Sequence, residues 1–531
     1  MFLAGAAVFS AVYGLAPLYY SNQNQYFLHG LAQAGVGCLR EDWLANTRDP
    51  TPVFTALVAF TVKYLHPWLF YLYYALLLGA YVAGMLGLFA FVVSRAVAIR
   101  RWPAFLALFV AIHSALARWC SYRCFGQDYP WFLQAGVAGQ YVLGAYLQPS
   151  AFGVLLIVAV DLFVHGRLGL AGSCVGLAAI VHPSYLLAGG LLTLGFIAAL
   201  VAERHFRQAL GLGVFSLALV TPIIVHVVVV FGPTSAETFV QAQEVLVNLR
   251  IPHHSRPDRW MDAVAVLQLG WMLLALVLVR KTRLFLVLCV PFGLGVLLTL
   301  VLLLTGSPTL ALLFPWRVSA VLVPIATTIV LSKLSAAPIP GLESTTVRLA
   351  AGAVVAVCVS AGCWIRATGI AFRSGDEELG VMNFVRRTVQ SGDVYFLPVT
   401  VPDLAKTTRG SLSSDFKPLP DKRQDARIIP VDLQRFRLYT GAPIYVDFKA
   451  IPYKDSEVVE WRDRIHRTQI VPKLLGTSCF SRAVAFAYLR ELGVTHLIVP
   501  ADARQAGDGP DMIYHDEYYR IYRIDQVRHG D

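Results

Sequence analysis

Charged residues are scarce in this 531-residue chain: they make up 15% of it, whereas hydrophobic residues make up 56%. An ordinary soluble domain has roughly a quarter charged residues, so the composition excludes a single soluble globular protein. Residues 1–371 contain 21 of the 44 Lys and Arg and 11 of the 33 Asp and Glu, a net charge of +10, whereas residues 372–531 are near neutral at +1. We therefore expect a multi-pass membrane domain over 1–371 and a soluble domain over 372–531.

Several signatures of catalysis are also missing. Residues 372–531 contain no Gly-rich phosphate fingerprint, no HExxH zinc motif and no GxSxG nucleophile motif. No metal site is predicted, although the loop carboxylates described below would suit a divalent cation. The net charge of +11 does not indicate nucleic acid either, because the basic residues of the first part lie in short loops between apolar runs.

The apolar residues form about eleven runs that are long enough, or nearly so, to cross a bilayer, which needs about 20 residues per helix. The runs are 2–20, 68–94, 103–118, 150–165, 168–183, 184–202, 208–231, 261–279, 284–305, 317–332 and 347–368. The first run lacks a basic flank and a cleavage site, so we expect a retained anchor rather than a cleaved signal peptide.

The short loops between these runs indicate an orientation. If the N-terminus is cytoplasmic, five short loops on that side are basic, as the positive-inside rule requires; they carry Arg95, Arg100, Arg101, Arg167, Arg204, Arg207, Arg280, Lys281, Arg283 and Lys333. The longer segments then face outside, namely 21–67, 119–149, 232–260 and 306–316. We predict an integral protein of a bacterial inner (plasma) membrane whose C-terminal domain is extracytoplasmic, with its function on the outer face.

The C-terminal part has a mixed pattern. Amphipathic helices are predicted over 377–389 and 481–492, and strands over 393–401, 495–501 and 518–525. This alternation is typical of a small α/β domain, in which Asp403–Arg427 is expected to be a polar loop. Two short polar stretches, Asp447 to Lys449 and Tyr453 to Asp455, either close over a membrane pocket or form ion pairs within turns.

Acidic residues are concentrated in the first long loop. Asp42, Glu41 and Asp49 precede residues 53–66, which are apolar but too short to span and are expected to form an interfacial helix. A carboxylate at the membrane surface can act as a general base on an acceptor hydroxyl or hold a divalent cation. We expect Asp42 to be the first candidate, followed by Glu41 and Asp49; a merely solvated loop is the alternative.

Basic residues are densest in LRIPHHSRPDRW, residues 249–260. Guanidinium groups bind phosphate bidentately and histidine can donate to it or move protons, so Arg250, Arg256, His253 and His254 predict phosphate recognition. The alternative is a basic surface loop on anionic lipid.

Two further motifs lie on the same predicted face. His182-Pro-Ser-Tyr185 follows one apolar run and Arg317 opens another. Arg317 alone is explained by snorkelling, but together with His182, Tyr185 and the basic loop it predicts an anion pocket.

The layout resembles the GT-C superfamily of membrane glycosyltransferases. The resemblance rests on the first long loop with its acids, on Asp49-Pro-Thr-Pro-Val-Phe before the interfacial segment, and on the outer α/β domain. NQYFLHGLA, EDWLANTRDPTPVF, RIPHH and residues 436–461 are also similar to a bacterial multi-pass family without an assigned activity. The resemblance implies a polyprenyl-phosphate sugar donor and a loop carboxylate as base. The superfamily commonly places an acid just after the first helix, where this chain has Ser-Asn-Gln-Asn-Gln over 21–25.

The leading hypothesis is therefore a glycosyltransferase that moves a sugar from a polyprenyl-phosphate donor to an unknown acceptor at the outer face of the membrane. Arg250, Arg256 and Arg317 would neutralise the phosphate, His253 or His254 would assist its departure, and Asp42 would activate the acceptor. The alternative is a non-catalytic protein of the same frame that binds lipid-linked glycan, or a transporter. Transporters place ionisable groups near the middle of the membrane, whereas the charged residues of this chain cluster at the predicted membrane surfaces. This distribution disfavours transport but not binding.

Overall fold

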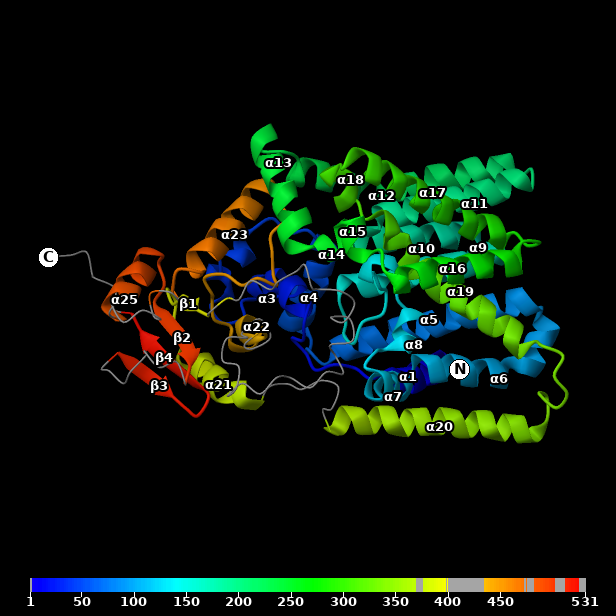
Figure 1. Cartoon of the computed structure of the whole chain (residues 1–531), viewed down its shortest axis with the longest axis horizontal. Coiled ribbons are helices and arrows are strands. Elements are labelled where there is room, and N and C mark those ends of the chain that lie inside the picture. Colours follow the sequence, from blue (N-terminus) through cyan, green and yellow to red (C-terminus); the bar gives the residue numbers. More distant parts are fainter. Residues whose placement is uncertain are drawn as a thin grey trace.

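The computed structural model describes residues 2–368, 376–397, 399, 434–471, 474, 482–501 and 511–524. Apolar helices lie side by side with similar axis directions in one half of the molecule, and a small sheet with flanking helices lies at the far end of the other half (Figure 1). The helices α3 (Leu28–Ala34) and α22 (Phe436–Thr440) lie between the two (Figure 1). We call the end of the helix bundle that faces the sheet the domain-facing end.

Each of the eleven apolar runs overlaps a helix. These are α1 (Phe2–Tyr13), α5 (Leu69–Val93), α6 (Arg95–His113), α9 (Val154–Val164), α10 (Leu168–Val181), α11 (Tyr185–Ala202), α12 (Phe206–Phe231), α16 (Ala263–Val279), α17 (Leu284–Thr305), α19 (Ser319–Ser335) and α20 (Thr345–Thr368). In the part of the chain that the structure describes, seven helices are long and apolar enough to cross a membrane. The protein is therefore a polytopic integral membrane protein, whereas the number of about eleven crossings stays a prediction, because α1, α9, α10 and α16 are shorter.

Two helix boundaries differ from the predicted runs. The first helix ends at Tyr13 rather than near residue 20, because Gly14 adopts a left-handed backbone (φ 76°) that stops the helical hydrogen-bond pattern. The helix α6 begins at Arg95, so the basic residues expected in a loop form its first turns instead. Arg101 is held there by Glu343, with 3.2 Å between Nε and Oε1.

The bundle has an enclosed centre and a lipid-like surface. Nearly every residue of α19 is buried, and this helix packs against α5 and α16. By contrast, α12 and α20 expose large apolar side chains such as Val228, Val229 and Leu349. Exposed apolar surface of this extent is explained by contact with lipid tails.

The long segments at the domain-facing end are folded rather than open loops. They contain α2 (Gln23–Tyr26), α3 (Leu28–Ala34), α4 (Pro52–Tyr64), α7 (Ala115–Phe125), α8 (Tyr129–Phe132), α13 (Ala236–Glu244), a π-helix (Val245–Arg250), α14 (Pro252–Ser255), α15 (Pro257–Trp260), α18 (Pro308–Leu312) and a short 3-10 helix (Pro315–Val318). The helix predicted over 53–66 is confirmed by α4, which Pro52 begins because its fixed φ suits the first helical position. Most of residues 131–151 are buried within the bundle rather than solvated.

The C-terminal part is an α/β unit. It contains α21 (Leu379–Thr388), β1 (Tyr395–Phe396), α22 (Phe436–Thr440), α23 (Asp455–Thr468), α25 (Arg482–Glu491), β2 (His496–Pro500), β3 (Met512–His515) and β4 (Tyr519–Arg523). The sheet order is β1-β2-β4-β3; β1 and β2 are parallel, and β4 is antiparallel to both neighbours. The five predicted helices and strands are present, whereas α22, α23 and β3 were not predicted. The loop Asp403–Arg427 and the predicted boundary at 371/372 lie outside the described residues.

Candidate functional site

A cavity of about 670 Å³ opens between the domain-facing end of the bundle and the C-terminal part. Its walls come from the first long loop, residues 139–150, the start of α11, the end of α12, and residues 250–254, 312–317 and 449–453. The ionisable residues that line it are Arg250, Arg259, Arg317, Lys449, His182, His253, His254 and, as the one carboxylate among the described lining residues, Asp262, together with tyrosines. The cavity therefore concentrates positive charge, which attracts anions.

Arg317 is held in one orientation on the cavity wall. It follows Phe314, whose left-handed backbone (φ 51°) is rare for a bulky residue and turns the chain into the 3-10 helix. Its Nη1 donates to Gln140 Oε1 and its Nη2 donates to His182 Nε2 at 2.8 Å. The guanidinium lies over the Tyr185 ring, 5.1 Å from its centroid. Its buried Nε–H has no hydrogen-bond partner among the described residues.

His182 supplies a second donor. An arginine N–H can only donate, so Nε2 of His182 accepts and, in the neutral ring, Nδ1 carries the proton. This Nδ1–H is buried and lacks a partner in the part of the chain that the structure describes. The Arg317–His182 pair thus presents two N–H groups whose hydrogen bonds are unmade.

Arg250 connects the bundle to the C-terminal part. It is the last residue of the π-helix, a wider turn that occurs often at functional sites. Its Nη2 donates to the Lys449 carbonyl, and its guanidinium lies 5.5 Å from the centroid of the Phe448 ring. Burial lowers the pKa of Arg250. Within the described chain, its buried Nε–H has no acceptor.

The rings of the adjacent histidines are in contact, with 4.0 Å between their centroids and 47° between their planes. Nδ1 of His254 donates to the Ala138 carbonyl at 2.6 Å, which leaves Nε2 as the proton acceptor of the neutral ring. Burial lowers the pKa of His254 to about 4 and holds the pKa of His253 far below its ordinary value. Both rings are therefore neutral at neutral pH, and an anion beside them would favour their protonation.

Five of the predicted site residues lie outside the cavity wall, namely Tyr185, Arg256, Glu41, Asp49 and Asp42. Tyr185 lies beneath Arg317 and donates through its hydroxyl to the Ser150 carbonyl at 2.6 Å. Arg256 pairs with Asp258, 3.0 Å between Nη2 and Oδ2. The exposed Glu41 accepts from Ser391 Oγ and Gly392 N, at 2.6 and 2.7 Å. Asp49 accepts from Thr51 N at 2.9 Å.

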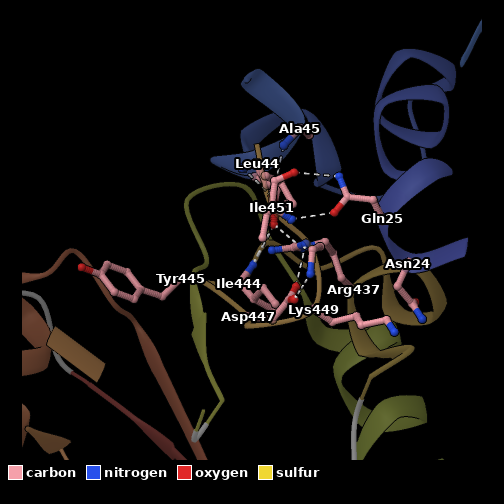
Figure 2. A network of polar contacts seen from close by, with 12 residues as sticks. Asn24, Gln25, Leu44, Ala45, Arg437, Ile444, Tyr445, Asp447, Lys449 and Ile451 are labelled. Carbon is pink, nitrogen blue, oxygen red and sulfur yellow. Dashed lines mark hydrogen bonds and ion pairs between the residues drawn. The ribbon is translucent and has the colours of Figure 1, made fainter. Parts of the chain in front are cut away.

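Asp42, the first candidate for the base, is fully buried and is absent from the cavity wall. Its Oδ2 lies 2.8 Å from Nε of Arg437 and accepts from Ile444 N at 3.0 Å, and its Oδ1 accepts from Leu44 N at 2.9 Å and from Ala45 N at 3.3 Å. Figure 2 shows this cluster, with Arg437 beside Asp447 and Ile444. A carboxylate whose acceptor sites are filled in this way has no access to an acceptor hydroxyl. The structure therefore gives Asp42 a structural role.

The Asp42 cluster positions the strand-like segment that closes the cavity. Arg437 also pairs with Asp447, 3.0 Å between Nη1 and Oδ2, and Asp447 Oδ1 accepts from Ala450 N. One residue further, Ile451 exchanges two hydrogen bonds with Gln25, at 2.8 and 2.6 Å (Figure 2). Lys449 is thereby held on the cavity wall. The polar stretches at 447–449 and 453–455 thus both line the pocket and form ion pairs, the two alternatives that the sequence left open. Lys449 and Tyr453 line the cavity, and Asp447 and Asp455 make ion pairs.

The site residues that sequence reasoning missed include several amides, the hydroxyl of Ser21 and the carboxylate of Asp262. Ser21, Asn22 and Gln25 line the cavity. They lie at the position where the sequence departs from the GT-C pattern, and this departure could have identified them as site residues. Gln140 and Gln148 also line it, but they lie in an apolar stretch with no motif. Among the described residues no group of three His, Cys, Asp or Glu could hold a metal. The cationic wall does not fit a divalent cation either.

Comparison with known proteins covers only a small part of the chain. Residues 420–468 match a family described as a domain of unknown function (DUF6798). No curated protein matches the chain. The described part of the matched region contains Arg437, Asp447 and Lys449, so the family resemblance falls on the residues that dock the C-terminal part and complete the cavity.

The substitution Asp42→Asn should destabilise the protein rather than remove a base. Loss of one partner of a buried ion pair leaves Arg437 with only the partly exposed Asp447 as a counter-charge and costs about 3 kcal/mol, so we expect a lower free energy of unfolding in chemical denaturation. Glu41→Gln, which alters the exposed neighbouring acid, is the matched control and should change it little. Equal stability of Asp42→Asn and the native chain would contradict this assignment.

The buried histidines should make stability depend on pH. Below an unfolded pKa of about 6.5 the unfolded chain binds a proton that His254 does not bind until about pH 4. The contribution of the neutral His254 ring to stability is therefore fully present above pH 6.5 and declines toward pH 4. Thermal unfolding at pH 7 and pH 5 would measure this decline. His254→Gln keeps a donor for the Ala138 carbonyl and should reduce the decline. The same dependence of stability on pH in His254→Gln and in the native chain would contradict the role of His254.

Proposed function

We propose that this protein binds a polyprenyl-phosphate sugar at the outer face of a bacterial inner membrane, with the phosphate in the cationic cavity. The supporting observation is the set of buried N–H groups on Arg250, Arg317, His182 and Gln140 that have no acceptor among the described residues. Each unmade buried hydrogen bond costs about 1–3 kcal/mol. Phosphoryl oxygens are strong acceptors for such groups and carry the charge that the cavity attracts.

The apolar part of the wall supports a lipid-linked ligand. Leu186, Leu187, Val227, Phe231 and Leu312 line the cavity from the ends of α11, α12 and α18. The volume of about 670 Å³ lies within the range of small-ligand sites, about 300–1,000 Å³, and suits a sugar phosphate but not a polyprenyl chain. The chain would leave past the apolar residues toward the exposed face of α12. The basic short loops at the other end of the bundle support the proposed orientation.

A second candidate function, transfer of the bound sugar, is favoured by Asp262, the one carboxylate among the described lining residues. In such a transfer the bond between the sugar carbon and the phosphate oxygen breaks with its electron pair remaining on the phosphate. The acceptor oxygen bonds to that carbon and its proton passes to the base. Asp262 Oδ1 caps α16 by accepting from Ala265 N at 2.9 Å, which fixes the carboxylate at the wall. Asp262 thus replaces Asp42 as the candidate base.

Removal of the charge of Arg317 should weaken binding of polyprenyl phosphate to the protein in lipid nanodiscs. Charge-assisted hydrogen bonds contribute about 1.5–3 kcal/mol, so Arg317→Gln should raise the Kd by about tenfold to a hundredfold. Arg256→Gln is the matched control, because Arg256 pairs with Asp258 outside the cavity. Equal losses in the two variants would show only a general charge effect and would contradict the assigned site.

The substitution Asp262→Asn separates binding from transfer. Asparagine also caps helices, so α16 should keep its start and donor binding should stay within about twofold of the native value. If the protein transfers sugar, loss of a general base should slow transfer of label from a radiolabelled donor by about 100-fold or more. Native-like transfer by Asp262→Asn would rule out Asp262 as the base.

A further inference from the structure

A second polar cluster lies in the cavity beside Arg317. Gln140, Gln148 and Ser150, which we call the amide cluster, line the cavity and are 2%, 1% and 6% exposed. Gln140 accepts from Arg317, so the amide cluster is continuous with the cationic wall. Buried amides without charge partners are unusual unless they are hydrogen-bonded, which makes their bonding informative.

The backbone that carries the amide cluster is held from several sides. The Tyr13 hydroxyl donates to the Leu143 carbonyl at 3.1 Å, and Gln23 Nε2 donates to the Leu147 carbonyl at 3.0 Å. These contacts come from the first helix and from α2. The segment is thus a preformed wall, as a binding site requires.

Each member of the amide cluster has one buried polar atom without a partner among the described residues: Gln140 Nε2, Gln148 Oε1 and Ser150 Oγ. The other end of each amide is engaged, since Gln140 Oε1 accepts from Arg317 and Gln148 Nε2 donates to the Tyr141 hydroxyl at 3.3 Å. The cluster therefore offers a donor at Gln140, an acceptor at Gln148 and a hydroxyl at Ser150.

A phosphate alone cannot satisfy this set. Ionised phosphoryl oxygens only accept, so they leave Gln148 Oε1 unpaired. An ammonium group could donate to it, but Arg250, Arg317 and Lys449 repel a cation in the same cavity. A hydroxyl group both donates and accepts, and several adjacent hydroxyls match all three atoms.

We propose that the amide cluster is a subsite for an uncharged, hydroxyl-rich sugar attached to the phosphate. This inference rests on the proposed function, because the phosphate bound by Arg250 and Arg317 places the sugar beside Gln140. Trp131 and Tyr141 also line the cavity, with 5.5 Å between their ring centroids, and offer apolar surface to a sugar ring. The subsite selects neutral sugars over amino sugars.

The test compares three lipids with the full chain in nanodiscs: polyprenyl phosphate, its neutral hexosyl derivative and an amino-sugar derivative. For the native chain we expect the hexosyl lipid to bind about tenfold more tightly than the bare phosphate, and the amino-sugar lipid to bind more weakly than the hexosyl lipid. Gln148→Met should abolish the gain, so that the hexosyl lipid binds no more tightly than bare polyprenyl phosphate. Ser150→Ala, which removes only an unpartnered hydroxyl and should fold normally, should reduce the gain.

Gln127→Met is the matched control, because Gln127 is exposed and absent from the cavity wall; it should keep the full gain. Equal affinity of the native chain for the bare and hexosyl lipids, with both lost in Arg317→Gln, would overturn the sugar subsite and leave the phosphate site intact. Tighter binding of the amino-sugar lipid would overturn the selectivity. A failure of all three lipids to bind would instead overturn the proposed function itself.

Discussion

The buried ion pair between Asp42 and Arg437 is the interaction on which the site depends. It joins residues 395 positions apart (437 − 42), and Ile444 is a further partner of Asp42. The contact continues to Asp447, whose turn carries Lys449 onto the cavity wall. A nearby backbone contact reinforces it: Cys38 N donates to the Gly441 carbonyl at 2.8 Å, and a Cβ at Gly37 would lie 2.6 Å from that oxygen. The glycines thus permit the close approach that brings the ionic groups together.

The cavity that this docking completes is electrostatically costly. Desolvation opposes the charge of Arg250 and the protonation of His253 and His254, as the lowered pKa values show. Stability alone would favour carboxylate partners for such groups, yet the acids of the first long loop are all engaged elsewhere. A preformed cavity with a cationic wall, in which buried N–H groups of Arg250, Arg317 and His182 have no acceptor among the described residues, is the arrangement that a site for an anionic ligand requires.

The helical architecture could be predicted from the sequence because lipid contact imposes long apolar runs, and every predicted run overlaps a helix. The basic residues His253, His254, Arg250, Arg317 and His182 were also identified, since polar groups between apolar runs are conspicuous, and the cavity unites them. The role of Asp42 could not be predicted, because its partner Arg437 lies far along the chain in a short helix without a motif. Gln140 and Gln148 were missed for a related reason. Amides in an apolar stretch carry no charge pattern, and only the fold shows that they face a cavity.

Photocrosslinking would show directly whether the cavity binds polyprenyl phosphate. The full chain in nanodiscs would be labelled with a polyprenyl phosphate that carries a photoreactive group near the phosphate, and the labelled peptides would be identified by mass spectrometry. We expect labels at the cavity wall, around residues 182–187, 250–254 and 312–317, and we expect excess unlabelled polyprenyl phosphate to compete with them. Labels confined to the exposed faces of α12 and α20, without competition, would contradict it.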